Sequence, residues 1–83
     1  MSVTRLQRAF GKNFRSHRQQ LGLSQERFAE MLGVHRTYLG GIERGERNLS
    51  LQSIEYYCSR LGLDPLTMLT PVEDEQAQPD PKL

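Results

Sequence analysis

Hydrophobic residues along most of the chain recur at steps of three and four, the spacing of amphipathic helices. Between Val3 and Leu21 the apolar positions are 3, 6, 10, 14 and 21, and His17 fills the gap. Gly22 then ends the pattern, as a glycine commonly does at the C-terminus of a helix. The chain is therefore predicted to open with a helix over residues 3–21.

Four shorter helices are predicted after Gly22, each bounded by a capping residue or a glycine. They cover residues 24–32, 35–42, 51–61 and a segment that opens at Asp64-Pro65. Their apolar positions are Phe28, Ala29 and Leu32, then Val34, Leu39 and Ile42, then residues 51, 54, 58 and 61. Because no stretch alternates as a strand does, the sequence predicts an all-α fold of five helices.

The apolar pattern ends after Thr70. The run PVEDEQAQPDPKL holds three prolines and four acidic residues and has almost nothing to bury. Such a composition is typical of disordered segments. We therefore expect one domain over residues 1–70 and a disordered tail over residues 71–83, because 83 residues leave no room for a second core.

Charge divides the chain into two unequal parts. Residues 1–63 carry ten Lys and Arg against five Asp and Glu, whereas residues 64–83 carry one against five. A basic front part indicates a polyanionic partner, although a merely solvated surface is the commoner explanation of charge alone. Nine of the eleven cations are Arg, whose planar guanidinium suits phosphates and guanine edges.

Cofactor, metal and catalytic chemistry finds little support. His17, His35 and the single Cys58 have no metal-ligand spacing, and Gly40-Gly41 lacks the context of a phosphate loop. No apolar run approaches the ~20 residues of a membrane span, and a lone cysteine suits a reducing compartment. We therefore expect a cytoplasmic protein that is not an enzyme and needs no cofactor, metal or small-molecule ligand.

The helices over residues 24–32 and 35–42 are joined by a turn that contains Gly33. This spacing is that of a helix-turn-helix, whose second helix lies in the DNA major groove, and also of an ordinary helical hairpin. The residue types favour DNA binding, because Arg and Thr can bond to base edges. The outer face of the second helix and the loop after it would offer Arg36, Thr37, Gly40, Gly41, Arg44 and Arg47.

The stretch SQERFAEMLGVHRTYLGGIERGERNLS resembles the Cro/C1-type, or XRE, family of helix-turn-helix regulators. The resemblance spans roughly residues 10–70 and rests on Gln25, Ala29, Gly33-Val34, Tyr38-Leu39, Ile42-Glu43 and Gly45. It implies a lambda-repressor-like DNA-binding domain. Within the family, the run HRTYLGGIERGERNLSL is similar to the controller proteins of restriction-modification systems, which are small dimeric regulators that bind operators near their own gene.

The resemblance also implies roles for single residues. Arg36 would contact a base, Thr37 a base or a phosphate, and Gln25 a phosphate. Tyr38 would lie near the DNA or simply pack the helix. Arg18 and Glu43 would form a structural ion pair outside the interface. The complete predicted DNA-binding set is Gln25, His35, Arg36, Thr37, Tyr38, Arg44, Arg47, Asn48 and Ser53.

A single module of this kind contacts few base pairs, so we expect a homodimer on a pseudo-palindromic operator. The last two helices supply apolar candidates for the dimer interface, which could equally belong to the core: Tyr57, Leu63, Leu66 and Leu69. Expected partners are double-stranded DNA, a second dimer on the same operator and RNA polymerase. The alternatives are another small XRE-type repressor, or an antitoxin or protein-interaction module of the same fold.

Overall fold

The computed structural model describes residues 3–72, and within them the chain forms five helices and no strand. The helices are α1 (Arg5–Gln20), α2 (Gln25–Leu32), α3 (Arg36–Glu43), α4 (Leu51–Leu61) and α5 (Pro65–Leu69). This arrangement confirms the predicted all-α fold. The tail predicted over residues 71–83 falls, from residue 73 onward, outside the described residues.

Local capping explains where the helices begin and end. Ser24 and Ser50 accept a hydrogen bond from the backbone N–H three residues further on, and so cap α2 and α4 as predicted. α1 begins later than the apolar pattern indicates, because Thr4 and Gln7 form a capping box around its first turn. Gly33 ends α2 with φ 73°, a left-handed backbone conformation that residues other than glycine rarely adopt.

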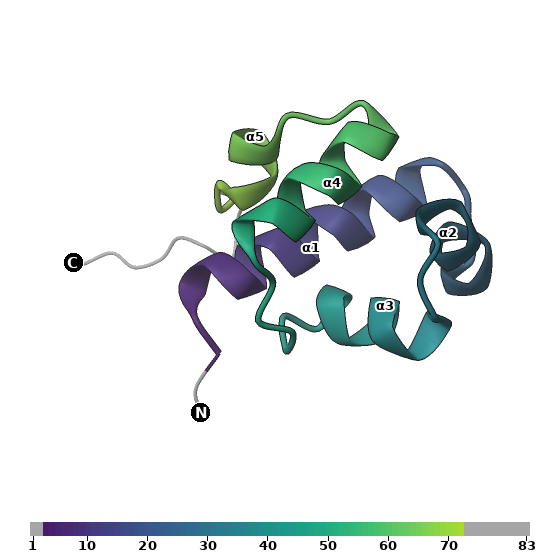
Figure 1. Cartoon of the computed structure of the whole chain (residues 1–83), viewed down its shortest axis with the longest axis horizontal. Coiled ribbons are helices and arrows are strands. Elements are labelled where there is room, and N and C mark those ends of the chain that lie inside the picture. The colour runs from purple at the N-terminus through teal and green to yellow at the C-terminus, as the bar shows by residue number, and fades with distance from the viewer. Residues whose placement is uncertain (1–2, 73–83) are drawn as a thin grey trace.

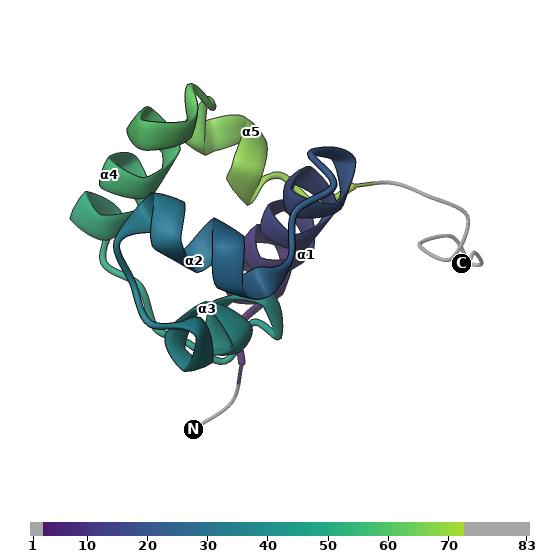
Figure 2. The ribbon, with the colours of Figure 1, turned by 90° about the vertical axis from the view of Figure 1, so that its right-hand side faces the viewer.

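α1 runs through the middle of the molecule, with α3 against one side and α5 against the other (Figure 1). Viewed from the side, α2 stands between α4 and α1, and α3 lies beneath it (Figure 2). The close approach of α1 and α3 depends on Gly11. A Cβ there would lie 2.7 Å from the backbone oxygen of Glu43 and closer still to that of Ile42. Gly11 therefore allows α1 to support the end of α3.

The core is centred on Phe14 of α1, which is fully buried. Its ring lies 4.6 Å from that of Phe10 and 5.5 Å, edge to face, from that of Phe28, measured between centroids. Leu39 and Ile42 of α3 and Cys58 of α4 belong to the same buried cluster. Burying these apolar side chains is the main stabilising contribution to the fold.

Three residues of the predicted apolar faces lie largely outside this core. Leu6, Leu21 and Leu51 expose 50%, 48% and 76% of their surface. Leu6 and Leu21 stand near the two ends of α1, beyond the buried segment from Ala9 to Phe14. Leu51 is the first residue of α4, and the half-buried Leu49 before it packs against the core instead.

Two polar side chains tie the helices together. Arg60 of α4 donates from Nε and Nη2 to the carbonyl oxygen of Met31, in the last turn of α2, at 3.2 and 2.8 Å. Asn13 of α1 donates to the carbonyl oxygens of Met68 and Thr70, at 2.8 and 3.0 Å, and so satisfies the end of α5. None of the helices described is long and apolar enough to cross a membrane.

Candidate nucleic-acid interface

The first turn of α3 stands free of the core. Arg36 and Thr37 are exposed there, whereas Leu39 and Ile42 further along the helix are buried. His35 caps the helix, its Nδ1 accepting from the backbone N–H of Thr37 at 3.4 Å. The buried half of α3 therefore holds the helix against the domain, and the exposed half offers its side chains outward.

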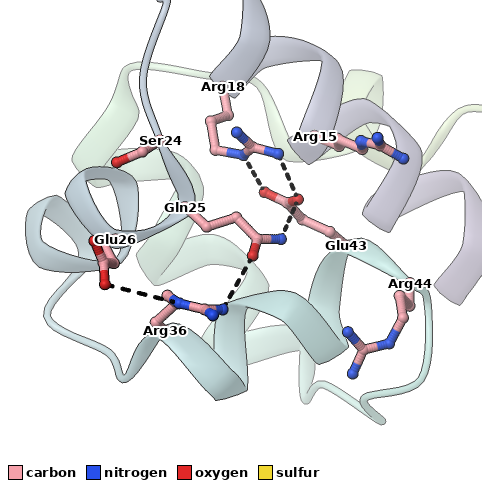
Figure 3. Close-up of a pocket in the computed structure, with 8 residues that line it drawn as sticks. All are labelled: Arg15, Arg18, Ser24, Gln25, Glu26, Arg36, Glu43 and Arg44. Carbon is pink, nitrogen blue, oxygen red and sulfur yellow. Dashed lines mark hydrogen bonds and ion pairs between the residues drawn. The ribbon is translucent and has the colours of Figure 1, made fainter.

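A chain of polar contacts links the core to Arg36 (Figure 3). Arg18 of α1 donates to both carboxylate oxygens of Glu43, from Nε at 2.7 Å and from Nη2 at 3.0 Å. Gln25 donates its Nε2 to Glu43 at 2.9 Å, which turns its Oε1 toward Arg36 Nη1 at 3.5 Å. Because an anion can only accept, Glu43 fixes which end of the Gln25 amide faces outward.

These residues line an open polar cleft of about 710 Å³ between α1, α2 and α3. Its cationic side chains are Arg15, Arg18, Arg36 and Arg44. Arg15 was missed by the sequence analysis, although its spacing of three from Arg18 places both on one face of a helix. Glu26 was also missed: its Oε2 lies 4.0 Å from Arg36 Nε in an exposed ion pair.

The loop between α3 and α4 folds back over α3. The guanidinium carbon of Arg47 lies 4.7 Å from the centroid of the half-buried Tyr38 ring. Gly40 and Gly41 lie beneath other side chains and are not open to solvent: a Cβ at Gly40 would meet Arg44 and Gln25, and one at Gly41 would meet Arg47. Arg44 is exposed and pairs with Glu46, from Nε to Oε1, at 3.1 Å.

The remaining predicted contacts lie at the edge of this surface. Asn48 is exposed in the loop, and Ser53 stands in the first turn of α4, where its backbone N–H donates to Ser50 Oγ at 3.0 Å. The structure thus places the predicted DNA-binding residues on α2, at the N-cap of α3, along α3 and in the segment that follows it.

The four apolar residues predicted for a dimer interface differ in exposure. Tyr57 is 8% exposed and belongs to the domain's own core. Leu63 and Leu69 are half-buried and pack against that core, whereas Leu66 is 73% exposed. Leu66 therefore offers the largest free apolar surface of the four.

The side chains of Cys58 and His17, which could in principle take part in chemistry, pack in or against the core. Burial raises the pKa of the Cys58 thiol, with a further contribution from Asp64, so the thiol is protonated near neutral pH. His17 is half-buried, and its ring centroid lies 6.3 Å from that of Phe28. Across residues 3–72, no three His, Cys, Asp or Glu side chains gather as a metal site would require.

Comparison with known proteins places the same segment in a family. The helix-turn-helix family model HTH_3 matches residues 14–67, which include α2, α3 and the polar cleft. Control protein C.SmaI of Serratia marcescens is 42% identical over 59 residues, covering 71% of this chain and 70% of that protein. Control protein C.BamHI of Bacillus amyloliquefaciens is 43% identical over 61 residues, covering 72% and 75%.

A solved structure agrees with these relatives. The restriction-modification controller protein C.AhdI from Aeromonas hydrophila superposes with a TM-score of 0.65 at 41% identity. The match covers 77% of this chain and 96% of that one. Sequence and backbone therefore point to the same group of proteins.

Proposed function

Because this chain belongs to the helix-turn-helix family of DNA-binding regulators, and within it to the restriction-modification controller type, we propose that it binds its operator as a homodimer. The operator is pseudo-palindromic and lies near the chain's own gene, in a restriction-modification operon. Two recognition helices related by a two-fold axis would then enter successive major grooves about 34–36 Å apart.

The observation that supports this proposal most is the position of Arg36. Its side chain, 55% exposed, stands at the free end of α3, beside a cleft with three further arginines. A guanidinium so placed can donate two hydrogen bonds to the O6 and N7 atoms of a guanine. The neighbouring Thr37 offers a hydroxyl to a base edge and a methyl group to a thymine.

The residues around the cleft suit the phosphate backbone. Gln25 lies in the first turn of α2, where helix N–H groups favour an anion. Arg44 lines the same cleft at the C-terminal end of α3, Asn48 and Ser53 follow in the loop and in α4, and His35 stands at the N-cap of α3. Contacts to phosphates would set the register of the protein on the duplex, while Arg36 and Thr37 supply the sequence preference.

A second copy would cover the apolar surface of α5. Leu66 is 73% exposed, and Leu63 and Leu69 on either side of it in the chain are half-buried. An exposed patch of this kind on a small domain is typical of a protein-protein interface. α5 packs on the side of α1 away from α3 (Figure 1), so a dimer formed through α5 would not cover the DNA-binding face.

Selection of bound duplexes from a random DNA pool tests the proposal, followed by titration at two salt concentrations. We expect a pseudo-palindrome with half-sites one helical turn apart, preferred over random DNA by at least about a thousandfold. Footprinting on that sequence with rising protein concentration, with and without RNA polymerase, would show whether a second dimer and the polymerase join the complex.

The opposite result would be binding that is weak, purely dependent on salt and indifferent to sequence. Charge alone would then account for the affinity, because neutralised phosphates release counterions from any duplex. That outcome would overturn the proposal and favour a protein-interaction module, such as an antitoxin. A palindromic operator that controls genes other than a restriction-modification operon would favour another small repressor of the same family.

A further inference from the structure

The side chain of Arg47, although the residue is exposed, lies along α3. An added Cβ at Gly41 would stand 2.9 Å from Arg47 Nε and 3.2 Å from its Cγ, so the two residues are in close contact. Beyond Gly41 the guanidinium reaches the Tyr38 ring, 4.7 Å from its centroid. The backbone of Arg47 is fixed as well, because Gln7 of α1 donates to its carbonyl oxygen at 3.1 Å.

Glycine within a helix lowers helix propensity, so an interior glycine of α3 needs a compensating role. Contact with α1 does not supply that role at Gly41, because the three atoms nearest to its hypothetical Cβ all belong to the Arg47 side chain. The close contact between α1 and α3 is made by Gly11 instead. The space above Gly41 is thus occupied by an arginine from the loop that follows the same helix.

We propose that Gly41 is a positioning residue for DNA recognition: its missing side chain lets Arg47 lie across α3 and stack on Tyr38. The stacked guanidinium becomes part of the surface of the recognition helix, close to its exposed face. Arg47 would then act at the edge of the groove with a fixed orientation. This inference rests on the proposed DNA-binding function and assigns to it a residue that touches no DNA.

The inference separates charge from position. Gly41→Ala leaves every charge in place but displaces the Arg47 side chain from its place over α3, since a Cβ 2.9 Å from Nε forces that side chain to shift. Affinity for random DNA and its salt dependence should therefore stay as in the parent protein, because both follow the number of cations. Affinity for the selected operator should fall about tenfold, the range of one stacking contact.

Three further variants sharpen the test. Arg47→Lys keeps the charge without the planar group, and should reproduce the loss of operator preference. Arg47→Ala removes the charge too, so it should also reduce the salt dependence. Combining Gly41→Ala with Arg47→Ala should weaken operator binding no more than Arg47→Ala alone, because both changes act on one contact.

Gly40→Ala is the matched control. It brings the same gain in helix propensity one residue earlier, and its Cβ would meet only the tip of Arg44, at 3.2 Å, and the more distant Gln25 amide. The exposed end of Arg44 can give way by the few tenths of an ångström that this contact requires, so we expect operator affinity within about twofold of the parent. A loss as large as that of Gly41→Ala would mean that stiffening α3, and not Arg47, is responsible, and would overturn the inference.

A measurement without DNA keeps the inference testable on its own. In NMR spectra of the free protein, the Nε–H signal of Arg47 should be shifted upfield by the Tyr38 ring, and Gly41→Ala should abolish that shift. An unchanged signal overturns the inference even if the protein proves to bind no operator. Equal weakening of operator and random DNA by Gly41→Ala would likewise overturn it.

Discussion

Arg18 of α1 and Glu43 at the end of α3 form a two-point ion pair inside the domain. Arg18 Nε lies 2.7 Å from Glu43 Oε2, and the two side chains expose only 13% and 3% of their surface. A third donor, Gln25 Nε2, bonds to the same carboxylate. The pair thus joins the two helices that meet at Gly11, and it also orients the amide that faces Arg36.

Glu43→Ala should reduce stability strongly, because it leaves the Arg18 guanidinium buried without its partner. Breaking a buried pair costs about 3–5 kcal/mol, a large share of the stability of so small a domain. Thermal unfolding followed by circular dichroism measures the loss. Glu30→Ala is the control, since its pair with Arg27 is exposed and should contribute less than about 1 kcal/mol. An unchanged melting temperature of Glu43→Ala would contradict a structural role for the pair.

Arg36→Ala should relax sequence preference at one base position of each half-site. The expected cost is about 1–3 kcal/mol on the operator and much less on random DNA, because the lost contacts are to a base edge. Fluorescence-anisotropy titrations with both duplexes measure the two affinities. Arg27→Ala removes an exposed arginine of α2 and serves as the control. Equal weakening on both duplexes would make Arg36 a phosphate contact.

Leu66→Lys should weaken self-association, because it places a charge on the most exposed of the apolar residues of α5. Loss of one central apolar contact raises the dimer dissociation constant by about tenfold or more. Sedimentation equilibrium measures this change directly. Leu21→Lys, at the C-cap of α1 with 48% exposure, adds the same charge outside α5 and should leave association unaltered. A dimer as strong as the parent's would place the interface elsewhere.

Arg60→Ala should lower the melting temperature, because the carbonyl oxygen of Met31 loses both of its donors from α4. A cation at the C-terminal end of α2 also complements the helix dipole, and together these contribute about 1–2 kcal/mol. In a small domain that corresponds to a fall of roughly 5–10 °C. Arg60→Lys keeps the charge but can donate from only one nitrogen, so its melting temperature should lie between those of the parent protein and Arg60→Ala. An unaltered melting temperature in both variants would show that this contact is not stabilising.

Stability should decline in alkaline solution. Burial raises the pKa of Cys58 above its ordinary value of 9.0, and burial together with Tyr38 and Tyr56 raises that of Tyr57 above 10.0. The unfolded chain therefore releases these protons first, so stability is complete below the ordinary pKa values and is lost as the pH rises through the raised ones. Urea unfolding between about pH 8 and pH 11 measures the slope. Cys58→Ala and Tyr57→Phe should each reduce the decline of the free energy of unfolding with pH. If both variants declined as steeply as the parent protein, other groups would be responsible.

Much of the fold follows from local chemistry that a sequence displays directly. Ser24, Ser50 and Gly33 act within one helical turn of their own positions, so their capping roles were predicted correctly. The buried positions of α2 and α3 were also predicted, since a period of three to four residues defines one face of a helix. The family resemblance was confirmed by the family match over residues 14–67.

Other features depend on which surfaces meet in space. Leu51 continues the apolar period of α4 yet is 76% exposed, because a helix cannot specify by itself where its neighbours end. Gly41 was assigned to the outer face, since a sequence does not show that the loop after α3 turns back and covers it with Arg47. Gln25 bonds to Glu43, 18 positions away, and to Arg36, 11 positions away, so this link depends on how the helices pack.

The sequence by itself determined the five helices, their caps and the kind of surface that α3 presents, because each of these arises from contacts within a few residues. Only the tertiary structure decided which arginines stand free and which are held: Arg36 by Gln25, Arg47 by Tyr38 and the space over Gly41. A long cationic side chain can adopt many rotamers, and the one it occupies is set by packing partners that lie elsewhere in the chain.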